Sequence, residues 1–103
     1  MAKNPTIFDQ AIYNLGEKIN ERQHKIDVLK RANAELREEV DSTNRSMDRM
    51  SWNDRVDAKN DIRDAETKIR INDEYIEQYT NEIKQFEQEI QEHMKLKDPS
   101  NDR

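Results

Sequence analysis

Residues 62–93 read IRDAETK IRINDEY IEQYTNE IKQFEQE IQEH when they are divided into sevens, and every group begins with isoleucine. The isoleucine row consists of Ile62, Ile69, Ile76, Ile83 and Ile90. A second row, three residues after each isoleucine, contains Ala65, Asn72, Tyr79, Phe86 and His93. Two mostly apolar rows that keep this spacing over four or more heptads are typical of a coiled coil.

The first half of the chain has the same pattern. One row contains Ile12, Ile19, Ile26, Asn33 and Val40, and its companion contains Phe8, Leu15, Arg22, Leu29 and Leu36. The two halves are out of phase by one residue, because counting on from Ile12 places a core position at Asp61 and not at Ile62. We therefore predict one all-α domain, with a helix over about 5–50, a turn at about 51–54, a second helix over about 54–97 and a disordered tail at 98–103.

Capping residues support these ends. Asn4 before Pro5 is a favourable helix start, and Thr6 with Asp9 three residues later is an alternative one. Ser51 followed by Asp54 resembles the start of the second helix. Lys95, Lys97 and Pro99 favour its end, because positive charge suits a helix C-terminus and proline cannot continue the helix.

The charges beside the apolar rows predict that the two helices run antiparallel. When Asn33 is placed opposite Asn72, every flanking pair is of opposite sign. These pairs are Lys18 with Glu89, Lys25 with Glu82, Lys30 with Asp73, Arg37 with Glu66, and Glu39 with Lys68. A shift by one heptad brings Glu39 opposite Asp61, and a parallel homodimer brings Lys25 opposite Lys30. Each exposed pair contributes only about 0.2–1 kcal/mol, but together they select orientation and register.

Two architectures satisfy these pairings. One is an antiparallel coiled-coil helical hairpin of two helices of about 45 residues. The other is an antiparallel dimer of continuous long helices, which makes the same contacts between chains. The absence of glycine and proline between Glu17 and Asp98 favours continuous helices, whereas the caps and the change of phase favour the hairpin. We prefer the hairpin.

The core rows also contain polar residues. Asn33 and Asn72 should form a buried amide pair that favours one register at some cost in stability. Arg22 should pack its aliphatic stem in the core and extend its guanidinium to the acidic rim.

The sequence offers little for catalysis. It contains no cysteine and two histidines, and it lacks a glycine-rich phosphate loop. Glu21 and His24 have the spacing of half a di-iron site, but the heptad places both on the outer surface, and the motif has no second copy. We therefore expect no enzyme activity, catalytic residue, metal or other cofactor.

Apolar residues outside the core rows are the candidate binding residues. One group, the tip, lies near the turn and consists of Met47, Met50, Trp52 and Val56. A second group, the mid-stalk patch, consists of Val28, Ala32, Ile71 and Tyr75. Exposed tryptophan and methionine are suited to protein recognition. The predicted function is non-catalytic protein binding, as an adaptor, assembly factor or inhibitor of a larger protein.

Two other functions fit the sequence. The chain could be a structural rod or scaffold that self-associates, for example as a homodimer, or an acidic nucleic-acid mimic that acts through Glu77, Glu82 and Glu89. The net charge of −5 argues against direct nucleic acid binding. No apolar stretch is long enough for a membrane span or signal sequence, so we expect a cytoplasmic protein without membrane contact. A bacterial or phage accessory protein would fit this expectation.

Overall fold

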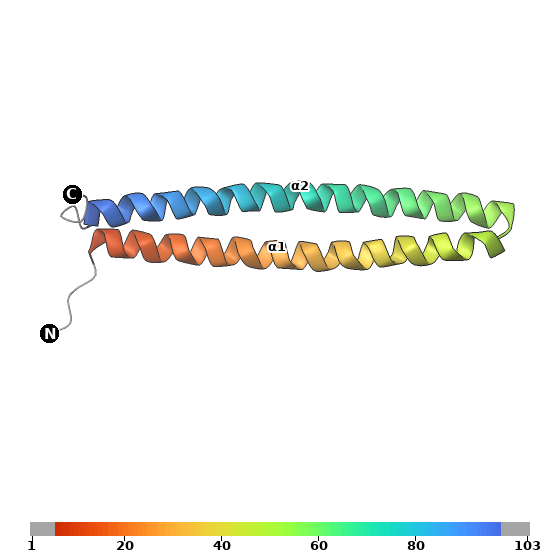
Figure 1. The fold of residues 1–103 in the computed structure, drawn as a ribbon, viewed down its shortest axis with the longest axis horizontal. Coiled ribbons are helices and arrows are strands. Elements are labelled where there is room, and N and C mark those ends of the chain that lie inside the picture. Colours follow the sequence, from red (N-terminus) through yellow and green to blue (C-terminus); the bar gives the residue numbers. More distant parts are fainter. Residues whose placement is uncertain (1–5, 98–103) are drawn as a thin grey trace. The chain divides into compact units, whose positions relative to one another are not determined.

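A computed structural model describes residues 6–97 as a helical hairpin. Its elements are helix α1 (Ile7–Ser46), a short 3-10 turn η1 (Met47–Arg49) and helix α2 (Trp52–Lys97). The helices run antiparallel and pack against each other, and no strand occurs in the described range (Figure 1). The predicted all-α hairpin is confirmed. The chain does not form the alternative, a continuous long helix, because α1 ends at Ser46 and α2 begins at Trp52.

Helix α1 begins with a reciprocal cap. The backbone N–H of Asp9 donates to Thr6 Oγ1 at 3.0 Å, and the N–H of Thr6 donates to Asp9 Oδ2 at 3.1 Å. These two bonds satisfy donors that the first helical turn leaves without partners. The alternative start at Asn4 and Pro5, and the tail predicted for 98–103, lie outside the described residues.

The turn lies earlier in the chain than predicted. We expected it at residues 51–54, but α1 ends at Ser46 and α2 already begins at Trp52. The physical reason is the Ser51 cap: its Oγ accepts the N–H of Asp54 at 3.3 Å, which makes Trp52 the first helical residue. Met50, with φ −90° and ψ 150°, is the extended residue that reverses the chain.

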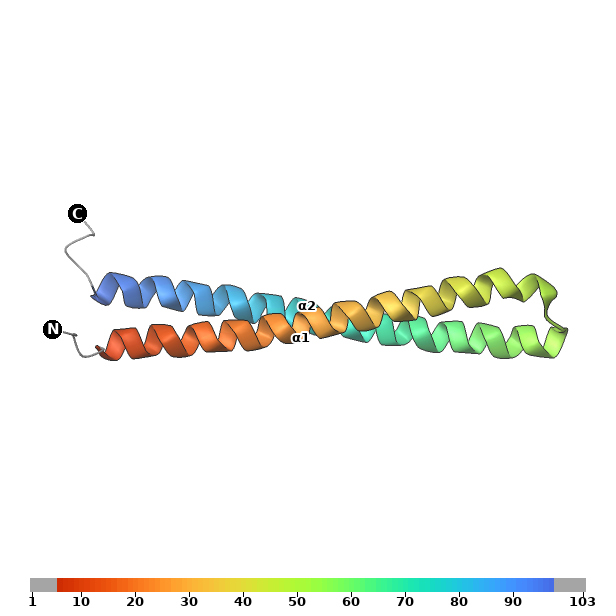
Figure 2. The ribbon, with the colours of Figure 1, turned by 90° about the horizontal axis from the view of Figure 1, so that it is seen from below.

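The chain divides into two compact units. Unit 1 pairs the part of α1 up to Lys25 with the part of α2 from Gln78 onward. Unit 2 contains residues Ile26–Glu77, including the turn. Two perpendicular views agree that α1 and α2 lie side by side within each unit (Figures 1 and 2).

The fully buried core is small in both units. Leu15 is buried in unit 1, and Ile26, Asn33, Ala58 and Ala65 are buried in unit 2. Most other members of the apolar rows are half-buried, because a seam between two helices is covered from one side only. Each buried residue therefore carries a large share of the stability.

Candidate functional site

The turn is held by one arginine. Arg55, in the first turn of α2, donates from Nε to the carbonyl oxygen of Met47 at 3.0 Å and from Nη2 to that of Asp48 at 3.3 Å. These carbonyls follow the end of α1, where backbone acceptors lack intrahelical partners. Charge-assisted bonds to them fix the 3-10 turn against α2. The tip is therefore a structured end of unit 2.

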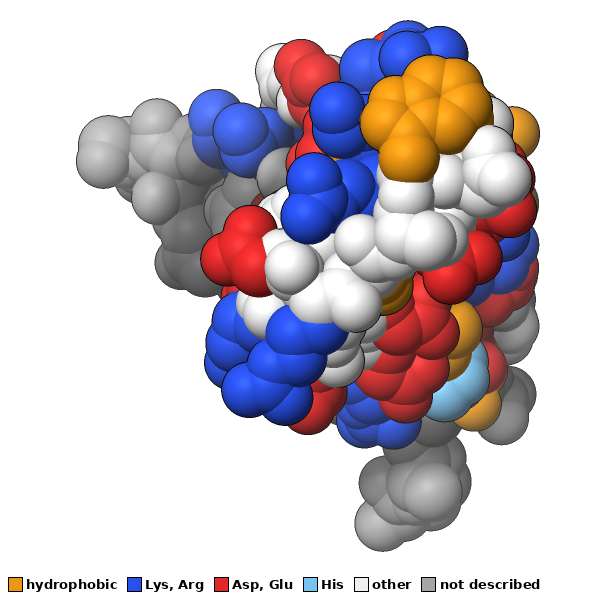
Figure 3. Space-filling view, turned by 90° about the vertical axis from the view of Figure 1, so that its right-hand side faces the viewer, with side chains coloured by type: hydrophobic (Ala, Val, Ile, Leu, Met, Phe, Trp, Pro, Cys, Tyr) orange, Lys and Arg blue, Asp and Glu red, His pale blue; other side chains and the backbone are white. Residues whose placement is uncertain are grey.

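Trp52 is the most exposed member of the tip, with 76% of its surface accessible. Val56, one turn further along α2, is also exposed, whereas Met47 and Met50 are half-buried. Figure 3 views the turn end and shows a large hydrophobic side chain standing out among basic and acidic ones. The predicted tip is thus a tryptophan supported by Val56, with the methionines partly covered beneath the surface.

The mid-stalk patch is also accessible. Val28, Ile71 and Tyr75 are exposed and Ala32 is half-buried, and all four belong to unit 2. None of them is needed to close the seam, which is formed by the heptad rows. The patch is therefore apolar surface that a partner could cover.

The amide pair lies where the register places it. Asn72 Nδ2 donates to Asn33 Oδ1 at 2.9 Å, and Asn33 Nδ2 donates to Asp73 Oδ1 at 2.9 Å. Asn33 is only 1% exposed, so its side of both bonds is shielded from water, whereas the Asp73 side chain is 55% exposed. Asp73 also forms an ion pair with Arg37, with 3.9 Å between Arg37 Nη2 and Asp73 Oδ2. A chain of polar contacts therefore crosses the apolar seam of unit 2.

Arg22 is the polar centre of unit 1. Its Nε donates to Glu82 Oε2 at 2.6 Å, its Nη1 donates to Glu21 at 3.0 Å, and its guanidinium lies 5.8 Å from the centre of the Phe86 ring. The Arg22 guanidinium lowers the pKa of Glu82, and a hydrogen bond from Gln78 adds to the effect. Glu82 in turn raises the pKa of Arg22. The predicted extension of Arg22 to the rim is confirmed.

This pair predicts a pH-dependent contribution to stability. Because the pKa of Glu82 is lower in the folded state, its contribution is present above the ordinary carboxyl pKa and is lost as the pH falls through the lowered value. We expect Glu82→Gln to be less stable than the wild type at neutral pH, and the difference in melting temperature to shrink on acidification. Thermal unfolding followed by circular dichroism at several pH values measures this. A difference that stays constant down to low pH would contradict it.

None of the five predicted flanking pairs forms an ion pair within residues 6–97. Lys25 forms an ion pair with Glu21 at 3.4 Å, and its Nζ lies 5.5 Å from the centre of the Tyr79 ring. Glu82 forms its ion pair with Arg22. Lys18 lies 5.8 Å from the centre of the Phe86 ring and is not paired with Glu89.

Unit 2 shows the same departure from the predicted pairs. Asp73 accepts a hydrogen bond from Asn33 and forms an ion pair with Arg37. It therefore forms no ion pair with Lys30, and Arg37 forms no ion pair with Glu66. Glu39 and Lys68 form no ion pair within residues 6–97, although both line one groove. Long side chains reach partners in neighbouring layers, and the energies that separate these choices are small.

A groove in unit 2 was not predicted. It has a volume of about 370 Å³ and is lined by Leu36, Glu39, Val40, Thr43, Asp61, Ile62, Asp64, Ala65 and Lys68. The available signal was Ala65, which stands in a row where the other heptads carry larger side chains. A small residue in a core row leaves space beside it.

Other chemical groups are sparse in the described part of the chain. No cluster of three or more histidine, aspartate or glutamate side chains has the geometry to hold a metal ion there. His93 packs beside Phe8 with ring centres 6.1 Å apart, and its buried Nδ1 has no hydrogen-bond partner. Neither described helix contains a stretch long and apolar enough to cross a bilayer.

Comparisons with protein-family models, with curated proteins and with solved structures found no match for this chain. The tip, the mid-stalk patch and the groove are therefore the candidate binding surfaces of the described residues.

Proposed function

We propose that the chain is a non-catalytic, cytoplasmic protein-binding module that presents Trp52 at the tip of a helical hairpin to a larger protein. It would act as an adaptor, an assembly factor or an inhibitor. The observation that carries the proposal is the 76% exposure of Trp52 at the start of α2, next to a turn that Arg55 holds in place. Tryptophan on a fixed backbone is a frequent anchor of protein interfaces, because it buries a large area with little loss of conformational entropy.

The two other functions have weaker support. A self-associating scaffold would use Trp52 to pack against another copy of the chain, so Trp52→Ala would change the oligomeric state. An acidic mimic that acts through Glu77, Glu82 and Glu89 has less support, because Glu82 is engaged by Arg22 at 2.6 Å.

The test is affinity capture from cells of the source organism, with the wild-type chain, Trp52→Ala and Leu96→Ala as baits. Leu96 is the matched control, because it is also exposed, at 62%, and lies near the other end of α2. We expect a specific partner to be recovered by the wild type and by Leu96→Ala, and its recovery to fall by roughly tenfold or more with Trp52→Ala.

Purification of that partner then allows a binding measurement with the same three chains. Circular dichroism should give equal helicity for all of them, since Trp52 and Leu96 contribute little to the core. Equal capture by Trp52→Ala and the wild type would refute binding through the tip. A change in mass by light scattering, in place of a loss of partner, would support the scaffold.

A further inference from the structure

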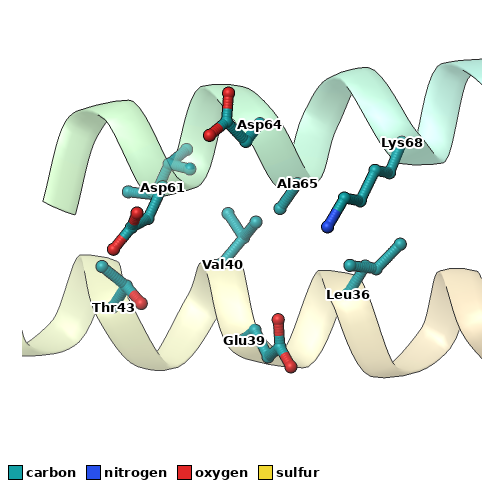
Figure 4. Close-up of a pocket in the computed structure, with 9 residues that line it drawn as sticks. Leu36, Glu39, Val40, Thr43, Asp61, Asp64, Ala65 and Lys68 are labelled. Carbon is teal, nitrogen blue, oxygen red and sulfur yellow. The ribbon is translucent and has the colours of Figure 1, made fainter. Parts of the chain in front are cut away.

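The groove in unit 2 has an apolar floor between the two helices. Leu36 and Val40 of α1 contribute one side, and Ile62 and Ala65 of α2 contribute the other. Figure 4 shows Val40 pointing toward Ala65, whose single methyl group leaves the space above it open. The floor is therefore apolar surface that side chains of a further helix could fill.

The rim of the groove is acidic. Glu39, Asp61 and Asp64 line it together with one cation, Lys68. An adjoining hollow on α1 is lined by Glu35, Glu38, Glu39, Ser42, Thr43 and Arg45. Five carboxylates therefore stand around the two hollows against two cations. None of these five carboxylates forms an ion pair within residues 6–97, in contrast to Glu82 in unit 1.

The groove continues into the mid-stalk patch. Ala32 and Glu39 are one heptad apart on α1, and Ile71 and Asp64 are one heptad apart on α2. Residues one heptad apart lie on the same face of a coiled-coil helix. Val28, Ile71 and Tyr75 therefore lie on the face where the groove opens, in line with the residues that rim the groove and the adjoining hollow. The result is a continuous strip in unit 2 with exposed apolar surface at one end and an acid-rimmed groove at the other.

We infer that this strip is the docking site for a basic amphipathic helix of a partner protein. The apolar stripe of that helix would fill the groove and cover the patch, and its flanking lysine and arginine side chains would meet the five free carboxylates. The three helices would then form a bundle with a fuller core than two helices provide. The charge argues against a second copy of the chain as occupant, because two acidic rims would face each other.

The strip and the tip are separate surfaces, so this inference does not depend on binding through Trp52. A defined probe tests it: a capped, fluorescein-labelled peptide of about three heptads, with leucine in the core rows and lysine at the flanking positions. The control peptide carries glutamate in place of lysine. Fluorescence anisotropy with the full chain, at a peptide concentration where light scattering shows the peptide to be monomeric, gives the dissociation constants.

Two charge-reversal variants of equal net charge are compared. Glu39→Lys with Asp64→Lys reverses the rim, whereas Glu87→Lys with Glu92→Lys reverses exposed carboxylates of α2 in unit 1. We expect the rim variant to bind the lysine peptide roughly tenfold more weakly than the control variant does. Ile71→Ser should weaken binding by roughly threefold or more, because it removes apolar contact from an exposed position.

Several results would overturn the inference. One is a failure of the lysine peptide to bind the wild-type chain, and another is equally tight binding of the glutamate peptide. The two double variants could weaken binding to the same extent, which would indicate general attraction to an acidic protein. A chain that forms a dimer by light scattering, and becomes monomeric with Ile71→Ser, would show that a second copy occupies the strip.

Discussion

Replacing Ile26 with alanine is expected to lower the free energy of unfolding by about 2–5 kcal/mol. Ile26 is 3% exposed, and it is one of the few fully buried apolar side chains among residues 6–97. A seam between two helices has few neighbouring atoms that can move into the space left by the lost side chain. The loss of buried apolar surface and the new cavity therefore both contribute.

The matched control is Val28→Ala, two residues away on the same helix. Val28 is 48% exposed, so its truncation should change the free energy of unfolding by no more than about 0.5 kcal/mol. Urea unfolding followed by circular dichroism measures both variants. Equal losses for the two would contradict the position of the seam, because they would mean that Val28 is as buried as Ile26.

Replacing both Asn33 and Asn72 with isoleucine is expected to raise stability by about 1–4 kcal/mol and to reduce structural specificity. The two amides bond each other at 2.9 Å in the described seam, and the exchange replaces this polar layer with an apolar one. An apolar layer packs equally well in registers that differ by a heptad. We therefore expect a higher melting temperature together with more than one oligomeric or register species.

The single variant Asn33→Ile serves as the control, since it removes the hydrogen bonds that Asn33 makes to the Asn72 amide and the Asp73 carboxylate. It should be less stable than the double variant. Analytical ultracentrifugation detects the mixture of species. A double variant that remains a single species with the original pairing would refute the role of the amides in specificity.

The sequence predicted those parts of the structure that repeat. The heptad rows predicted the antiparallel helix pair and the contact between Asn33 and Asn72, because burial of apolar side chains provides a large and regular energy. The caps and the change of phase between the rows favoured the hairpin. The extension of Arg22 followed from the same rows, since a charged group in a core row must reach the rim.

The remaining differences have physical causes. The flanking ion pairs were mispredicted because Arg22 reaches Glu82 from a core row, while Lys25 has Glu21 available four residues before it. The turn was displaced because Ser51 caps a helix that begins at the next residue. The groove was missed because heptad patterns record where apolar residues lie, and not how well Ala65 fills its layer.

The hairpin itself is tested most directly by a cross-link between Glu39 and Lys68, which line the same groove on opposite helices. The chain contains no cysteine, so Glu39→Cys with Lys68→Cys introduces the only thiols. We predict that a short bis-maleimide at low protein concentration gives an internally bridged chain with the mass of one 12.4 kDa protein plus the reagent. A covalent species of twice that protein mass would contradict the hairpin, since it would show that the two helices of each pair come from different chains.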